Sequence, residues 1–242
     1  MKEYKNKFNI HFYFTVGKCD NKKFTKELTQ QLYYERSYLC ELYENEIEEF
    51  FTSNRVKLNY DVDANSREFI KEIISLNPAS IINIRGRQKF SKDTVYAFRS
   101  KDIPFTNLHP SILPYYRGVV SSFWAMYHKE KDYGVTLHRV NEIYDAGAII
   151  GIKKSALDYS LSVVENMLRL VPLAEELLFE YLDNILCNNE SISLEKQDHS
   201  ISNYYTFPTD YELSSFLNKG LKLVNKERVE ILIKELTKQR LL

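Results

Sequence analysis

Alternating hydrophobic and polar positions near the start of the chain predict short β-strands. Apolar side chains recur at every second position over residues 8–16, which is the period of a strand. A second short strand is expected at residues 56–60. Residues 80–84 form a more continuous apolar run that ends at Gly86, as buried strands do.

Helical patterns lie between these strands. Residues 23–53 contain neither Gly nor Pro and suit one long helix or two consecutive helices. Residues 66–76 carry apolar side chains at helical spacing, with Asn65 or Ser66 as the cap. The repeated alternation predicts an α/β fold with a Rossmann-like, mostly parallel sheet covered by helices on both faces.

The middle of the chain places polar residues at the end of a predicted strand. An apolar stretch around Phe105 leads into Asn107 and His109. Pro110 and Pro114 then stop regular structure, because proline lacks an N–H and restricts the residue before it. We therefore expect a proline-pinned loop directly after two candidate functional side chains.

The next segments return the chain to the same region. A helix is predicted over residues 119–128 and a strand over residues 133–140. A turn at Asp145 follows, and a further strand begins at Ala148. Loops at strand ends are where α/β proteins usually carry catalytic groups, which makes Asp145 a third candidate.

A boundary is expected in the last quarter of the chain. A long helix is predicted from about Ser160 to Cys187, with a kink or break at Pro172. The polar stretch after it divides a core, residues 1–188, from a small C-terminal subdomain, residues 189–242. The subdomain should contain an aromatic loop and two helices, at residues 210–217 and 225–241.

Composition narrows the class of protein. The 33 basic and 33 acidic side chains balance, so no net charge attracts the chain to nucleic acid or to an anionic membrane. Cys19, Cys40 and Cys187 are widely spaced and indicate reduced thiols. No apolar run reaches the roughly 18 residues of a membrane span. We expect a cytoplasmic protein without a nucleic-acid or membrane partner.

From residue 107 on, the chain resembles the formyltransferase family. That family includes glycinamide ribonucleotide transformylase, methionyl-tRNA formyltransferase and the sugar N-formyltransferases, and its members take the formyl group from N10-formyltetrahydrofolate. The stretches that carry the resemblance, in order, are Asn107-Leu108-His109-Pro110-Ser111-Ile112-Leu113-Pro114, Tyr116-Arg117-Gly118, Gly134-Val135-Thr136-Leu137-His138 and Asp145-Ala146-Gly147-Ala148-Ile149-Ile150.

The resemblance implies an enzyme whose catalytic set is Asn107, His109 and Asp145. His109 would handle the proton of the attacking amine, since an imidazole titrates near neutral pH. Asn107 would donate to the oxyanion. Asp145 would hold the tautomer of His109 and assist proton delivery to the leaving nitrogen, with the division of proton transfer left open. No spacing of His, Cys and Asp favours a metal site, and the resemblance implies none.

The resemblance also implies a slot for the pterin of the folate, between a strand end and a turn. Its expected residues are Ile84, Arg85 and Gly86 on one side and Val140, Ile143 and Tyr144 on the other. His138 either supports the structure or lines this slot.

The motif does not determine which amine accepts the formyl group. The segment Tyr204-Tyr205-Thr206-Phe207-Pro208 resembles the C-terminal region of sugar N-formyltransferases, so Tyr204, Tyr205 and Phe207 could stack on a nucleotide base. Alternatively, these rings cover a small C-terminal core. Arg117 either orders its loop or contacts an anionic substrate. The resemblance favours a dTDP-linked 4-amino-4,6-dideoxyhexose, for surface-polysaccharide (O-antigen) synthesis, and a homodimer.

Other members of the family remain as alternatives. Glycinamide ribonucleotide transformylases generally have a Gly-rich phosphate loop after the first strand, and residues 16–20 depart from that pattern. Methionyl-tRNA formyltransferases carry an additional basic domain, whereas this chain is neutral. A formyltetrahydrofolate hydrolase would use the same groups with water in place of the amine. An inactive binding module fits poorly with an intact Asn107, His109 and Asp145.

Overall fold

The computed structural model describes residues 7–15, 24–38, 49, 58–86, 88–187 and 192–241. Cys19, Cys40 and most of the second half of the predicted 23–53 helical region lie outside these residues. Cys187, which is described, is an exposed free thiol.

The main sheet has four strands in the order β3-β4-β6-β7. Their bounds are β3 (Ile81–Ile84), β4 (Phe105–His109), β6 (Asp132–Arg139) and β7 (Ile149–Ala156). β3 and β4 are parallel, while β6 is antiparallel to both β4 and β7. The α/β class is confirmed, and the sheet is mixed. β6 and β7 are antiparallel because residues 140–148 are too few for the crossover of about a dozen residues that a parallel pair would need.

Two smaller sheets accompany the main one. β1 (Phe12–Thr15) runs parallel to β2 (Leu58–Val62). The two-residue strands β5 (Arg117–Gly118) and β8 (Tyr204–Tyr205) also pair in parallel. The second pairing joins the proline-pinned loop to the C-terminal segment.

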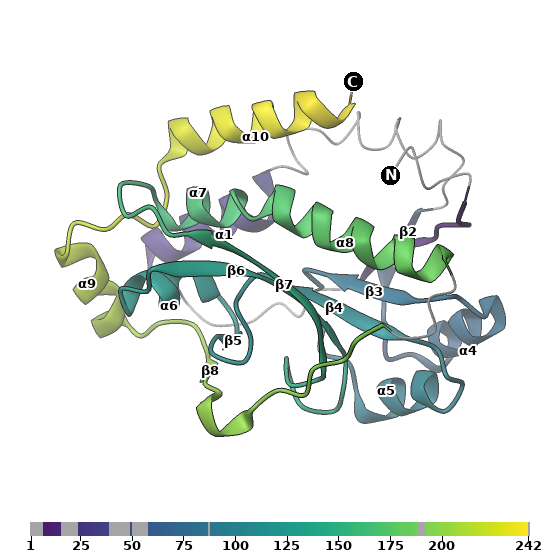
Figure 1. Cartoon of the computed structure of the whole chain (residues 1–242). Coiled ribbons are helices and arrows are strands. Elements are labelled where there is room, and N and C mark those ends of the chain that lie inside the picture. The colour runs from purple at the N-terminus through teal and green to yellow at the C-terminus, as the bar shows by residue number, and fades with distance from the viewer. Residues whose placement is uncertain are drawn as a thin grey trace.

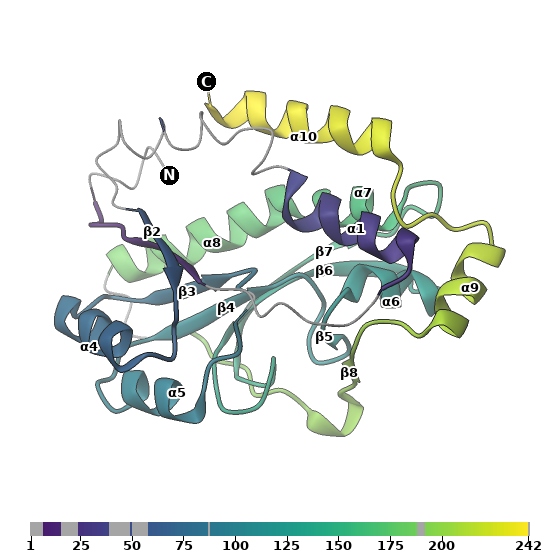
Figure 2. The same cartoon turned by 180° about the vertical axis from the view of Figure 1, so that it is seen from behind.

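The two faces of the main sheet are covered by different helices (Figures 1 and 2). α8 (Val171–Leu186) packs Leu177 and Tyr181 against Leu108 and Leu137, with Val135 in the same cluster. α4 (Arg67–Leu76) and α5 (Lys92–Arg99) pack around Phe105 and belong to another cluster. Ser66 caps α4 as predicted, whereas α5 was not predicted.

The remaining helices lie toward the end of the molecule away from α4 and α5 (Figure 1). They are α1 (Lys26–Arg36), α6 (Ser121–Tyr127), α7 (Val163–Leu168), η1 (His199–Ile201), α9 (Asp210–Asn218) and α10 (Lys226–Leu241). The predicted 160–187 helix is broken into α7 and α8, and Pro172 lies in the first turn of α8, where its missing N–H costs nothing. Buried residues of α9 share a cluster with those of α1 and α6.

The alternation of side chains along β4 explains where a cavity forms beside the sheet. Phe105, Asn107 and His109 lie on the face opposite Leu108, because successive side chains of a strand alternate. Phe105 contacts Phe98 of α5 with ring centroids 5.6 Å apart, so the start of this face is covered. Asn107 and His109, further along, line a cavity.

Candidate active site

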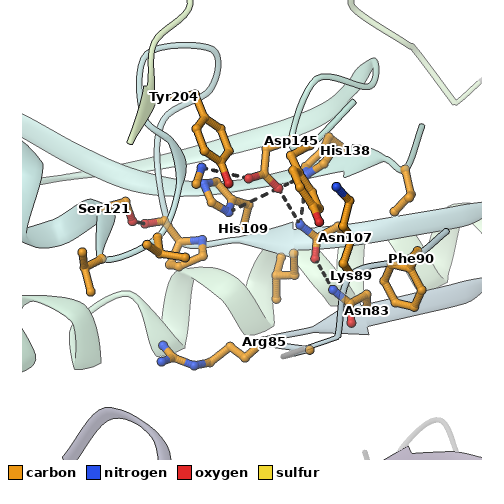
Figure 3. Close-up of a pocket in the computed structure, with 18 of the residues that line it drawn as sticks. Asn83, Arg85, Lys89, Phe90, Asn107, His109, Ser121, His138, Asp145 and Tyr204 are labelled. Carbon is orange, nitrogen blue, oxygen red and sulfur yellow. Dashed lines mark hydrogen bonds and ion pairs between the residues drawn. The ribbon is translucent and has the colours of Figure 1, made fainter. Parts of the chain in front are cut away.

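Strand register places three polar side chains in one row. Asn83 of β3 pairs with Asn107 of β4, and Asn107 pairs with His138 of β6. Asn83 Nδ2 donates to Asn107 Oδ1 at 2.7 Å, and Asn107 Nδ2 contacts His138 Nε2 at 3.1 Å. The row runs along the cavity wall, as Figure 3 shows.

His109 is held by the loop that follows it. Its Nε2 lies 2.9 Å from the Tyr116 carbonyl oxygen, which also accepts from Ser111 Oγ at 2.7 Å. A carbonyl oxygen only accepts, so Nε2 carries the hydrogen and a neutral His109 has its lone pair on Nδ1. That Nδ1 faces Asp145 Oδ1 at 3.7 Å. The carbonyl of Tyr116, rather than Asp145, therefore sets the tautomer of His109.

Asp145 reaches the row from the loop between β6 and β7. Its Oδ2 accepts from the Gly118 N–H at 2.9 Å, and its Oδ1 accepts from Asn107 Nδ2 at 3.3 Å. The same Oδ1 lies 3.7 Å from His138 Nε2. The carboxylate is thus shared among the amide of Asn107, two imidazoles and a backbone N–H.

His138 is a neutral member of the group. Its Nδ1 donates to the Arg139 carbonyl oxygen at 2.8 Å, which leaves Nε2 to accept from Asn107. Burial, and repulsion from His109 whenever that ring is protonated, lower the pKa of His138 to about 4, although Asp145 acts in the opposite direction. His138 therefore keeps the amide of Asn107 oriented without carrying a charge near pH 7.

The cavity beside this row has a volume of about 430 Å³. Of the residues expected to hold a folate, Arg85, Gly86, Val140, Ile143 and Tyr144 line it. Ile84 is not among the lining residues, and its side chain is 52 % exposed.

The residues expected to bind the acceptor separate into two groups. Tyr204 and Phe207 line the cavity. Tyr205 does not, and its ring stacks on Tyr116 and Trp124 at centroid distances of 5.3 and 5.0 Å. Arg117 lies outside the lining, with its guanidinium 5.9 Å from the centre of the Tyr204 ring. Tyr205 therefore occupies the aromatic core that the sequence allowed as the alternative.

Two residues that contact the catalytic candidates were not identified from the sequence. Asn83 interrupts the apolar run Ile81-Ile82-Asn83-Ile84, a polar position that could have been noticed. Gln197 donates to the backbone at Asp145 and Gly147, and the sequence around it gives no comparable signal.

The arrangement suits chemistry at an acyl carbon. In its neutral form His109 offers a ring nitrogen with a free lone pair, beside a carboxylate that can stabilise the ring once it accepts a proton. Asn107 supplies amide N–H groups at the same cavity wall. The described parts of the chain contain no group of three or more His, Cys, Asp or Glu placed to hold a metal ion.

The fold and the site define an α/β protein with a polar-lined cavity at the ends of its strands, and the comparison with known families identifies its family. The family model described as formyl transferase matches residues 45–182, more than half of the 242-residue chain. The chain belongs to the formyl transferase family. Within the described residues, no helix is both long and apolar enough to cross a membrane.

Curated relatives agree with this family. A methionyl-tRNA formyltransferase of Thermotoga neapolitana is 28% identical over 163 residues, which cover 67% of this chain and 50% of the relative. A GDP-perosamine N-formyltransferase of Brucella melitensis is 32% identical over 115 residues, 44% of this chain and 43% of the relative. The chain thus spans about half the length of these relatives, or less.

One structural neighbour is similar over most of its length. A 4-N formyltransferase from Francisella tularensis aligns with a TM-score of 0.55 at 15% identity, over 86% of each chain. At this identity the likeness demonstrates a shared fold.

Proposed function

We propose that this protein transfers a formyl group from N10-formyltetrahydrofolate to the amino group of a nucleotide-linked amino sugar. Membership of the formyl transferase family supports the reaction class. The observation that carries the proposal is the convergence of Asn107, His109 and Asp145 on one cavity wall.

The catalytic roles follow from the contacts. His109 Nδ1 accepts the proton of the attacking amine, and the resulting imidazolium is stabilised by Asp145. Asn107 donates an N–H to the formyl oxygen as negative charge develops there. The contact of Asn107 Nδ2 with Asp145, at 3.3 Å, is longer than its contact with His138. The N–H that points to Asp145 is therefore the one that turns to the formyl oxygen. Asp145 then assists protonation of the leaving nitrogen.

The cavity fits a flat, partly apolar donor. Val140, Ile143 and Tyr144 provide apolar surface, while Arg85 and Gly86 lie at the end of β3. A side chain at Gly86 would place its Cβ 2.1 Å from Asn83 Oδ1, so glycine leaves room for the Asn83 side chain at this edge of the cavity. When bound, the folate supplies the formyl group.

For the acceptor we propose a dTDP-linked 4-amino-4,6-dideoxyhexose. Tyr204 offers an exposed ring at the cavity for a base, and Arg117 lies next to it for the diphosphate. Residues 1–188 would be the catalytic core and residues 189–242 the part that completes acceptor binding. The enzyme would act as a cytoplasmic homodimer that supplies surface-polysaccharide (O-antigen) synthesis.

Two curated relatives give the competing acceptors, a GDP-linked sugar and methionyl-tRNA. The test supplies N10-formyltetrahydrofolate with, separately, the dTDP-sugar, the GDP-sugar, glycinamide ribonucleotide and methionyl-tRNA, and detects formylated product by mass spectrometry. We expect the dTDP-sugar to be formylated fastest. Faster formylation of the GDP-sugar would correct the nucleotide alone. Formylation only of tRNA or glycinamide ribonucleotide, or release of formate alone, would refute the amino-sugar acceptor.

A matched pair of variants connects the activity to the site. His109→Ala removes the proposed base, whereas His199→Ala removes an exposed histidine of η1. We expect turnover to fall by orders of magnitude only in the first variant. Equal activity in both would show that formylation, if observed, does not use His109.

A further inference from the structure

The turn that carries Asp145 has an unfavourable backbone conformation. Asp145 adopts φ 50°, in the left-handed region that residues other than glycine seldom occupy. Such a conformation persists only where surrounding contacts enforce it. The Gly118 N–H holds the carboxylate of Asp145 but makes no contact with the backbone of the turn.

The backbone of the turn is held by Gln197. Its Nε2 donates to the Asp145 carbonyl oxygen at 2.9 Å and to the Gly147 carbonyl oxygen at 2.7 Å. The side chain is 4 % exposed, and its Oε1 has no partner. Only the NH₂ end of an amide can serve two carbonyl oxygens, so the geometry fixes the orientation of Gln197.

Gln197 is itself anchored close to the turn. Two residues before it, Glu195 exchanges two backbone hydrogen bonds of 2.8 Å with Ile149 of β7. After it, β8 pairs with β5, whose Gly118 is the residue that donates to Asp145. Residues 195–205 therefore contact both sides of the Asp145 turn. They lie outside residues 45–182, the part of the chain that the family model matches.

We propose that Gln197 is a positioning residue that sets the location of the Asp145 carboxylate relative to His109. This inference rests on the proposed formyl transfer for its kinetic consequence. Gln197 takes no part in the chemistry, because its amide contacts backbone alone. Without it, the buried carbonyl oxygen of Gly147 and the partly buried one of Asp145 lose their donor, and the turn relaxes away from the left-handed conformation.

The main variant is Gln197→Leu, which keeps the volume and removes both donors. We expect kcat to fall about 10²-fold, as small displacements of catalytic groups do, while KM for the acceptor changes little. The matched control is Asn166→Leu. Asn166 is also a buried amide, and its Nδ2 donates to the carbonyl oxygens of Asp158 and Ser162 at 2.9 and 3.2 Å, with no contact to Asp145.

A second variant uses pH. Gln197→Glu places a buried carboxyl against two carbonyl oxygens, where only the protonated form can donate, to one of the two. The activity of this variant relative to wild type should therefore rise as pH falls from 8 to 6. A relative activity that is low and independent of pH would contradict the proposal. Should Gln197→Leu fail to fold, this near-isosteric variant decides the question.

A readout that needs no turnover separates this inference from the proposed function. Hydrogen exchange of the Gly118 amide, followed by NMR, reports whether the carboxylate of Asp145 still accepts from it. We expect exchange to accelerate at least tenfold in Gln197→Leu and to stay unchanged in Asn166→Leu. If the wild type formylates no acceptor, the proposed function fails, and the exchange result alone decides the role of Gln197.

Two results would overturn the proposal. One is unchanged Gly118 exchange in Gln197→Leu. The other is a loss of kcat no larger than that in Asn166→Leu when the two variants have the same melting temperature.

Discussion

Acidification is expected to destabilise the fold through His138. Folding lowers the pKa of this imidazole from 6.5 to about 4, chiefly because the ring is buried. Between these two values the unfolded chain binds a proton that the folded chain does not, so stability rises with pH across this window. The contribution of neutral His138 is complete above pH 6.5 and is lost as the pH falls toward 4.

The size of the effect follows from the same pKa values. One pH unit of difference corresponds to about 1.4 kcal/mol, so the full window is worth up to roughly 3 kcal/mol. The side chain is 2 % exposed, and solvent therefore screens little of this contribution. A loss of this size is a large fraction of the about 5–15 kcal/mol by which domains are stable.

The assay is urea unfolding at a series of pH values between 7.5 and 4, with His138→Gln compared to wild type. The variant is expected to be less stable at neutral pH, because the hydrogen bonds to Asn107 and Arg139 are altered. The decisive quantity is the slope of the unfolding free energy against pH. His199→Gln, which removes one exposed imidazole, serves as the control. Parallel slopes for wild type and His138→Gln would refute a neutral, buried His138.

Three further predictions concern the site and its surroundings. His109→Ala should reduce kcat by roughly 10²–10⁴ with unchanged circular dichroism, and near-normal turnover would exclude it as the base. Tyr204→Ala should raise KM for the nucleotide sugar through lost stacking of about 1–3 kcal/mol, whereas Tyr205→Ala should lower the melting temperature instead; the reverse pattern would contradict their placement. Gly118→Ala should lose both stability and turnover, because Gly118 has φ 101° and a Cβ there would lie 2.0 Å from the Tyr205 carbonyl oxygen. A Gly118→Ala variant with wild-type melting and kcat would show that this loop can rearrange.

The contacts that the sequence could predict are those of regular elements. The alternation over residues 133–140 places Val135 and Leu137 on the α8 face and His138 on the cavity face, as expected from a period of two. The motif residues lie at strand ends and in one turn, so their convergence follows from the order of strands in the sheet.

What the sequence could not provide depends on contacts between remote segments. Tyr204 and Tyr205 are neighbours in a motif-like stretch, yet β8 sends one ring to the cavity and the other into the aromatic core. Which of the two faces the cavity depends on the pairing of β8 with β5. The tautomer of His109 depends in the same way on the carbonyl of Tyr116, which side-chain identities do not reveal. α5 was not predicted because its apolar residues, Val95 to Phe98, are consecutive, and eight residues are too few for a helical period to stand out.

The C-terminal segment, residues 192–241, contributes to the site as well as the motif residues do. Five of its apolar side chains are at most 3 % exposed and fill clusters shared with α1, α6 and α7: Leu213, Phe216, Leu223, Val229 and Ile233. At about 1.5–3 kcal/mol for each buried side chain, their combined contribution is comparable to the whole net stability of a domain. The same segment supplies Gln197 to the Asp145 turn and Tyr204 to the cavity. Packing by residues 192–241 therefore stabilises the fold and, at the same time, determines the position of a catalytic candidate more than fifty residues earlier in the chain.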